Sequence, residues 1–231
     1  MKSLSSLSKN MSKYYNLTPI KLGCEIRGVD LKTENRPEVI EQIKKDVTDH
    51  RILVFKDQGV ISGDRHVEIS RWFGELESTF YKHPKSPHPD VFRVSNDSKE
   101  GCTGVGRTGW HIDGSFQPAP FAYSLYHMVS IPQQGNTSFA PLNELVESLP
   151  SEKRKEWERL WMLSDRRSGP IHPLIYPHPL TGKKWEDGDF IISDNLAVGH
   201  EATPETQLPR ERVGLRVLHR TTIKGSHPPK K

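Results

Sequence analysis

The sequence lacks the features that would place it in several large classes of protein. It has only two cysteines, Cys24 and Cys102, in 231 residues, which is too few for a disulfide framework. No apolar run approaches the roughly 20 residues that a membrane-spanning helix needs, and no secretory signal segment stands near the N-terminus. We therefore expect a globular protein of a reducing compartment, cytoplasmic by default, with no membrane partner.

Acidic residues are absent from the first 24 positions. Four lysines precede Glu25, the first acidic residue, and the remaining 33 − 4 = 29 Lys and Arg balance the 29 Asp and Glu. The whole formal charge of +4 therefore lies in a Ser/Lys-rich stretch, which argues against nucleic acid as a partner because no basic domain face remains. We expect residues 1–14 to be a disordered leader. A mitochondrial presequence is the alternative, although the stretch has no arginine.

Apolar periodicity predicts helices early in the chain and strands later. Residues 38–50 have a helical pattern, Ser62 is placed to cap a second helix that runs to Phe73, and Ser151 starts a charged helix. Strands are expected at 25–31, 51–55, 91–94, 123–131, 161–166, 190–193 and 215–223, with turn residues between them. This order favours an α+β domain built on an antiparallel sandwich or barrel. We expect one domain over 15–225 and a tail over 226–231.

The most informative local pattern is His111-Ile112-Asp113. On a strand, residues i and i+2 point to the same face, so this spacing would place an imidazole beside a carboxylate. These are two of the three ligands of the 2-His-1-carboxylate site of non-haem Fe(II) oxygenases. The pattern is weak alone, because the composition gives about 11 × 29/231 ≈ 1.4 such triplets by chance. A hydrogen-bonded histidine near a surface turn is the alternative.

Two segments near the C-terminus could complete such a site. Asp194-Asn195 ends an apolar strand, and His200 follows six residues after Asp194. The segment 214–223 then alternates, so that Arg216 and Arg220 share one face. Two arginines on one face of an apolar strand are costly unless anions meet them. A solvent-exposed face is the alternative, and the pattern alone leaves both open.

Taken in order, these segments resemble the TauD/TfdA family of Fe(II)- and 2-oxoglutarate-dependent dioxygenases, which includes taurine dioxygenase. The similarity spans roughly residues 17–225, and the order of the motifs is more specific than any one of them. The matching motifs are PIKLGCEIRGVDL (19–31), RILVFKDQ (51–58), WFGEL (72–76), GWHIDGSF (109–116), GNT (135–137), HPLTG (178–182), DNLAVGH (194–200) and RVLHRTTIKG (216–225).

The resemblance implies a double-stranded β-helix, the jelly-roll or cupin-like fold, with flanking helices. Residue by residue, it makes His111, Asp113 and His200 the Fe(II) ligands. It implies that Arg216 and Thr137 bind 2-oxoglutarate, a co-substrate together with O₂. It also implies that the enzyme hydroxylates a small, anionic organic substrate and releases succinate and CO₂.

The sequence departs from the family pattern at the junction of Lys184 and Trp185, where a core strand and a helical segment are absent. We therefore expect an internally shortened form. The residues expected to contact the substrate also differ from the family pattern. Arg220 matches a family position that can hold an acidic group of the substrate, but the substrate-binding histidine of the family has no clean counterpart. His83 and Arg107 are the candidates in its place.

Three functions remain open at this point. The first is an active dioxygenase with a small-molecule substrate, which the complete ligand set motivates. The second is a catalytically impaired or non-catalytic form, a binding or regulatory module, which the junction at Lys184–Trp185 motivates. The third is a zinc hydrolase, because two histidines and a carboxylate also suit Zn²⁺. The family resemblance also brings in a homo-oligomer as an expectation.

Overall fold

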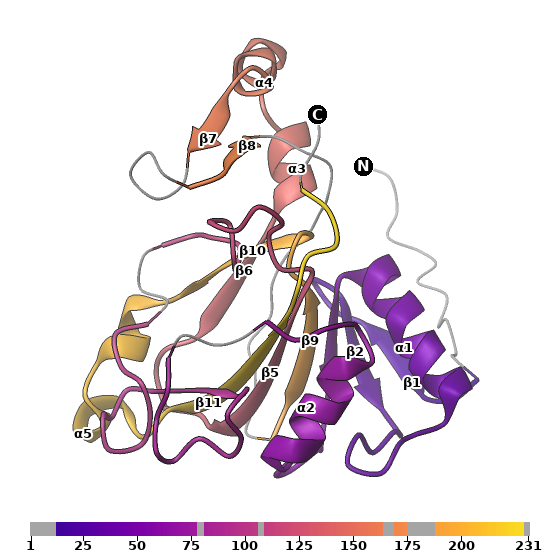
Figure 1. Cartoon of the computed structure of the whole chain (residues 1–231), viewed down its shortest axis with the longest axis vertical. Helices are drawn as coiled ribbons and strands as arrows, with labels where there is room; N and C mark the ends of the chain where they lie inside the picture. The colour runs from indigo at the N-terminus through magenta and orange to yellow at the C-terminus, as the bar shows by residue number, and fades with distance from the viewer. Residues whose placement is uncertain (1–12, 78–80, 106–108, 164–168, 175–187, 229–231) are drawn as a thin grey trace, which may run out of the picture.

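The computed structural model describes residues 13–77, 81–105, 109–163, 169–174 and 188–228. Strands and helices follow one another as the sequence predicts, with helices early and most strands late (Figure 1). The strands are β1 (Asn16–Pro19), β2 (Cys24–Arg27), β3 (Ile52–Phe55), β4 (Phe92–Ser95), β5 (Tyr123–Ser130), β6 (Thr137–Pro141), β7 (Trp161–Leu163), β8 (Ile171–Pro173), β9 (Phe190–Asp194), β10 (Val198–Ala202) and β11 (Val217–Ile223). The helices are α1 (Pro37–His50), α2 (Gly63–Arg71), α3 (Leu142–Glu147), α4 (Ser151–Trp157) and α5 (Arg210–Val213), with a 3-10 turn over Pro204–Gln207.

A seven-stranded sheet forms the main layer, in the order β1-β2-β3-β9-β5-β11-β4. Its neighbours are antiparallel except for β2 and β3. Helices α1 and α2 lie along one side of this sheet (Figure 1). The α1 residues Val39, Ile43 and Val47 are fully buried against the strands. Their i, i+4, i+8 spacing gives α1 one apolar stripe, which explains why this helix packs on the sheet.

Both helices begin and end where their sequences dictate. Pro37 opens α1, where its missing N–H costs nothing. The helix stops at Arg51, whose φ of 70° puts it in the left-handed region typical of a helix end. Ser62 caps α2 by accepting a hydrogen bond from the backbone N–H of Arg65.

A smaller sheet covers the opposite face of the main sheet. Strands β6 and β10 pair antiparallel, and His111 adds a single bridge to His200 on β10. A second apolar cluster fills the space between the two sheets, with Tyr126, Ile191 and Leu218 from the main sheet meeting Phe139 and Val198 from the smaller one. Two facing sheets around one core are the architecture of a jelly roll, so the predicted fold class is confirmed.

A hairpin and two short helices stand apart from this core, at the top of Figure 1. Strands β7 and β8 pair with each other, and α4 buries none of its residues. Trp161, Leu163 and Ile171 on this hairpin are 46–61% exposed. Among the described residues, no helix is long and apolar enough to cross a membrane.

The predicted elements agree with the structure except at a few positions. Strand 25–31 is shorter than expected, because β2 ends at Arg27. His111 lies in an isolated bridge, and the residues after it form a turn rather than a strand. The HPLTG motif, the Lys184–Trp185 junction and residues 1–12 of the expected leader lie outside the described residues, so these expectations stay predictions.

Candidate metal centre

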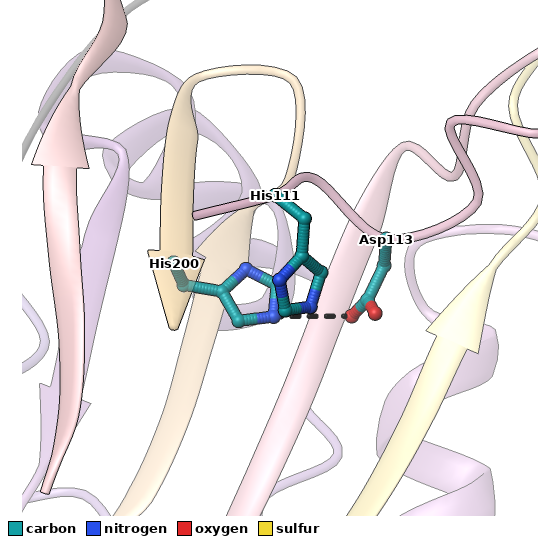
Figure 2. A group of neighbouring side chains, drawn as sticks. All are labelled: His111, Asp113 and His200. Carbon is teal, nitrogen blue, oxygen red and sulfur yellow. Dashed lines mark ion pairs between the residues drawn. The ribbon is translucent and has the colours of Figure 1, made fainter. Parts of the chain in front are cut away.

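Three side chains converge at the edge of the smaller sheet: His111, Asp113 and His200 (Figure 2). One ligand atom from each lies within 4.8 Å of the others. Nε2 of His200 is 3.7 Å from Oδ2 of Asp113, and the two imidazole rings lie 4.5 Å apart between centroids. It is the one group of three or more such side chains found among the described residues.

Backbone pairing brings the two histidines together. The N–H of His111 donates to the carbonyl of His200 at 3.0 Å, and the N–H of His200 donates back at 2.8 Å. Nδ1 of His111 lies 2.7 Å from the carbonyl oxygen of Gly109, so Nδ1 carries the proton. This fixes the tautomer and leaves the Nε2 lone pair for a ligand.

Both carboxylate oxygens of Asp113 are held. Ser124 Oγ donates to Oδ2 at 2.9 Å, and Arg220 Nη1 donates to Oδ1 at 2.7 Å. Burial acts to raise the pKa of Asp113, but Arg220, the two histidines and the Ser124 hydrogen bond outweigh it and lower the pKa below its usual value. The carboxylate is therefore ionised at neutral pH, as a metal ligand must be.

His200 is neutral in this environment. Burial lowers its pKa to about 4, against a smaller opposing effect of Asp113. The hydroxyl of Tyr126, on β5, lies 3.4 Å from Nε2 of His200. The imidazoles of His111 and His200 and the carboxylate of Asp113, open toward a cavity, form the donor set that Fe(II) takes in non-haem oxygenases. The residues present therefore fit such a metal.

The buried Arg216 lies close to this group. It is 3% exposed, and its Nη2 donates to Oγ1 of Thr137 at 3.5 Å. Burial lowers its pKa to about 10, so the guanidinium still carries its charge at neutral pH. Arg216, Thr137, Tyr126 and the two histidines line one small pocket of about 40 Å³ between the sheets. The solvent-exposed alternative for this face of the strand is therefore wrong.

A larger cavity of about 530 Å³ is also lined by metal ligands. Its walls carry the aromatic rings of Tyr81, Phe92, Phe116 and Phe121, and Arg220 lines it beside Asp113. The guanidinium of Arg220 also lies over the ring of Phe92, 5.2 Å from its centroid. Cavities of this size take small organic molecules.

Of the two remaining sequence candidates for substrate contact, His83 and Arg107, the structure describes only His83. His83 is not among the residues that line either pocket. Its Nε2 is 3.1 Å from the carbonyl oxygen of Ser98, and its Nδ1 accepts the N–H of Lys85 at 3.2 Å. Arg107 lies outside the described residues.

Sequence reasoning did not find three side chains that the structure places at the metal ligands. Ser124 and Tyr126 lie on β5, where alternation alone puts them on the face toward the site. Asn195 lies in the turn before β10 and contacts the backbone of Asp113. Strand β5 also carries other polar residues, such as His127 and Ser130, so no sequence signal singled out Ser124.

Comparisons with known proteins agree with this arrangement. The family model "Taurine catabolism dioxygenase TauD, TfdA family" matches residues 13–184. An alkylsulfatase of Acinetobacter baylyi is 27% identical, and the alignment covers 79% of this chain and 77% of that protein. An alpha-ketoglutarate-dependent sulfonate dioxygenase of Saccharomyces cerevisiae is 28% identical, with 74% of this chain covered. The chain spans 48% of that relative's length.

A sulfate ester dioxygenase of Pseudomonas putida is 27% identical over 61% of this chain and 46% of its own length. Among solved structures, a taurine dioxygenase from Burkholderia xenovorans superimposes with a TM-score of 0.73 at 23% identity, covering 93% of this chain and 91% of that one. The matched region of the family model contains His111 and Asp113 and covers well over half of the chain. The chain belongs to the TauD/TfdA family of 2-oxoglutarate-dependent dioxygenases, enzymes that use Fe(II), 2-oxoglutarate and O₂.

Proposed function

We propose that this chain hydroxylates a small organic anion, with 2-oxoglutarate and O₂ as co-substrates and succinate and CO₂ as products. The observation that supports it most is the convergence of His111, Asp113 and His200 within 4.8 Å. The buried charge of Arg216 lines the same small pocket as the two histidines. A buried guanidinium beside metal ligands suits an anionic co-substrate better than it suits a zinc hydrolase.

In this proposal His111, Asp113 and His200 hold Fe(II), which supplies the oxidising chemistry when it is bound together with 2-oxoglutarate and O₂. The protein keeps His200 neutral through burial and Asp113 ionised through Arg220. His200 and Asp113 are thus in their metal-binding form at neutral pH, so no proton must leave either of them before a metal arrives.

Arg216 and Thr137 hold the distal carboxylate of 2-oxoglutarate. A planar guanidinium donates two parallel hydrogen bonds to a carboxylate, and the hydroxyl of Thr137 adds a third. The pocket they line is about 40 Å³ and shares His111 and Arg220 with the larger cavity.

The 530 Å³ cavity holds the substrate, with its apolar part against the aromatic walls and its anionic group toward Arg220. We propose an organic sulfate ester or sulfonate as the substrate class, which the names of the relatives support. Arg220 must then share its guanidinium between Asp113 and the substrate. His83 and Arg107 remain candidates for a second contact to the same anion.

The test is turnover of 2-oxoglutarate to succinate by the purified chain with Fe(II), O₂ and a panel of alkyl sulfates and alkyl sulfonates. Substrate-dependent succinate is expected from the wild type and at least 100-fold less from His111→Ala. The control is His50→Gln, which changes a histidine in the last turn of α1 that lines neither pocket at the metal ligands. Equal turnover by the wild type and His111→Ala would refute the proposal.

A second candidate is a form that binds the metal but does not turn over. Two observations favour it: the narrow pocket at Arg216, and the family-model match that ends at residue 184, where the sequence departs from the family pattern. Metal binding without succinate formation, on any member of the panel, is its expected result.

A further inference from the structure

The turn between β9 and β10 carries a buried amide that grips the backbone of the metal-ligand segment. Asn195 is 1% exposed. Its Oδ1 accepts the N–H of Asp113 at 2.8 Å, and its Nδ2 donates to the carbonyl of the same residue at 2.9 Å. Nδ2 also donates to the carbonyl of Phe121 at 2.7 Å. One side chain thus binds both backbone polar groups of Asp113.

The orientation of this amide follows from its partners. An N–H faces the oxygen end, and two carbonyls face the nitrogen end, so the reversed amide would put like groups against each other at all three contacts. Both N–H groups of the Asn195 amide donate hydrogen bonds, one to the carbonyl of Asp113 and one to that of Phe121. The contact is therefore specific to asparagine at this position.

The turn is itself fixed, and it leads directly to the other ligand. Oδ1 of Asp194 accepts the N–H groups of Leu196 and Ala197 at 3.1 and 3.2 Å. The chain then enters β10, which carries His200. The amide therefore joins two segments that are 82 residues apart, one holding the carboxylate ligand and the other a histidine ligand.

We infer that Asn195 is a positioning residue of the metal centre: its amide locks the backbone of Asp113 relative to the strand of His200, and so sets the metal affinity. This inference rests on the proposed function, because it takes His111, Asp113 and His200 as the ligands. Asn195 makes none of these contacts with a ligand atom of Asp113, so it acts only through the backbone. Partners of this kind change metal affinity by 10–100-fold when they are lost.

The chain offers a matched control elsewhere. Gln58 is also a buried amide, 3% exposed, with three hydrogen bonds to backbone groups. Its Oε1 accepts the N–H of Leu31 at 2.8 Å, and its Nε2 donates to the carbonyls of Val29 and Lys56 at 3.0 and 2.8 Å. Gln58 lines neither pocket at the metal ligands. Removing it loses the same bonds without touching the site.

The experiment compares Asn195→Leu with Gln58→Leu, and Asn195→Asp with Gln58→Glu as the gentler pair. Mn(II) binding to the full chain is measured by the electron paramagnetic resonance signal of the free ion, without 2-oxoglutarate. Thermal unfolding of the metal-free proteins is followed in parallel. We expect both members of a pair to lose thermal stability, and the Asn195 member alone to raise the Mn(II) dissociation constant at least 10-fold.

Two results would overturn the inference. One is a folded Asn195 variant that binds Mn(II) as tightly as the wild type. The other is an equal loss of affinity in the Gln58 variant, which would make the effect a general consequence of instability. Failure of the proposed metal site has a different signature: wild type and His111→Ala would bind Mn(II) equally, or not at all, before any Asn195 variant is considered.

Discussion

Arg216 is a charge that the fold buries at a cost. Its guanidinium is 3% exposed, and its described side-chain partner is one hydroxyl, that of Thr137, at 3.5 Å. Burial lowers the pKa of Arg216 to about 10 with no compensating acid. A buried cation with so little compensation destabilises a protein, and replacement by an apolar residue is often stabilising. We therefore attribute Arg216 to ligand binding rather than to folding.

This predicts opposite effects on stability and on ligand binding for Arg216→Met. The variant should unfold at the same or a higher temperature than the wild type, because an uncompensated charge has been removed. Its dissociation constant for 2-oxoglutarate, measured anaerobically with Fe(II) by the visible absorption of the complex, should rise at least 100-fold, about 2.7 kcal/mol.

The variant Thr137→Val measures how much Thr137, as distinct from Arg216, contributes to 2-oxoglutarate binding. It removes one hydroxyl and keeps the charge, so the dissociation constant should rise only about 3–10-fold, or about 0.7–1.4 kcal/mol, the net contribution of one ordinary hydrogen bond. A large loss of stability in Arg216→Met with unchanged 2-oxoglutarate binding would reverse the assignment and make Arg216 a structural residue.

At the residue scale, spacing and motif order were enough to predict that His111, Asp113 and His200 would meet. They could not reach Ser124 or Asn195, because these two act through hydrogen bonds between segments far apart in the chain. Such contacts depend on the register of strands, which the sequence does not state. His83 follows the FGEL element and both of its ring nitrogens contact backbone groups, so its contact with the substrate stays a prediction.

One face of strand β11 points into the space between the two sheets, and the other face points toward helix α2. Leu218 packs into the core between the sheets, on the same side as Arg216 and Arg220. His219 and Thr221 lie on the other side, where Thr221 is 3.1 Å from Nε2 of His66 on α2. Alternation in the sequence predicted that Arg216 and Arg220 share one face, and this is confirmed. For the segment of His111 the strand prediction was wrong, because a turn follows the single bridge to His200.

Three buried histidines lie in the layer between α2 and the main sheet. The ring of His127 lies 6.4 Å from that of His66 and 5.9 Å from that of His219, between centroids. Each has one bonded nitrogen: His66 to Thr221, His127 to the carbonyl of Gly59 and His219 to Arg93. Nδ1 of each is buried without a hydrogen-bond partner. The charged side chain in contact with this group is the guanidinium of Arg93, which lies against Nε2 of His219.

This layer should make the protein sensitive to acid. Burial lowers the pKa of all three histidines, to about 3 for His219. Between their unfolded value of about 6.5 and these lowered values, the unfolded chain binds protons that the native state does not. The free energy of unfolding is therefore highest above pH 6.5 and falls as the pH drops toward 3, by up to about 1.4 kcal/mol per pH unit for each histidine.

Substitution of His219 alone measures its contribution to the pH dependence of the free energy of unfolding. In His219→Gln the amide oxygen can still accept from Arg93, and the slope of unfolding free energy between pH 6 and pH 5 should decrease by about 1 kcal/mol per pH unit. The control His227→Gln changes an exposed histidine of the C-terminal segment outside this layer. Urea unfolding at a series of pH values gives both slopes. Parallel lines for the wild type and His219→Gln would contradict the assignment.

The molecule has a well-buried core and one region, formed by β7, β8 and α4, that leaves apolar side chains exposed. The main sheet, α1 and the ligand-bearing strands are well buried, whereas β7, β8 and α4 expose large apolar side chains such as Trp161 and Ile171. This region is followed by residues outside the described ranges, and the family-model match ends at residue 184. Fold class and site were predictable because motif order encodes them. The expected shortening at Lys184–Trp185 lies outside the described residues and stays a prediction.

Ligand-dependent stability tests whether this chain, as it stands, forms a working site. A ligand that binds only the native state, present at 100 times its dissociation constant, stabilises it by about 2.7 kcal/mol. For a chain of this size that corresponds to a rise of about 5–10 °C in the unfolding temperature. Mn(II) should give one such rise, and 2-oxoglutarate added to the Mn(II) form should give a second.

Two variants show which residues cause each rise in the unfolding temperature. His200→Ala should lose both, since 2-oxoglutarate needs the metal, whereas Arg216→Met should keep the Mn(II) rise and lose the second. An unfolding temperature that neither ligand changes would favour the non-catalytic form, because a native site that binds its ligands must be stabilised by them. If Mn(II) raises the unfolding temperature and 2-oxoglutarate adds no second rise, the protein binds the metal but not the co-substrate at Arg216. Calorimetry therefore distinguishes an intact enzyme, a metal-binding protein with a closed co-substrate pocket and an inert chain without knowledge of the substrate.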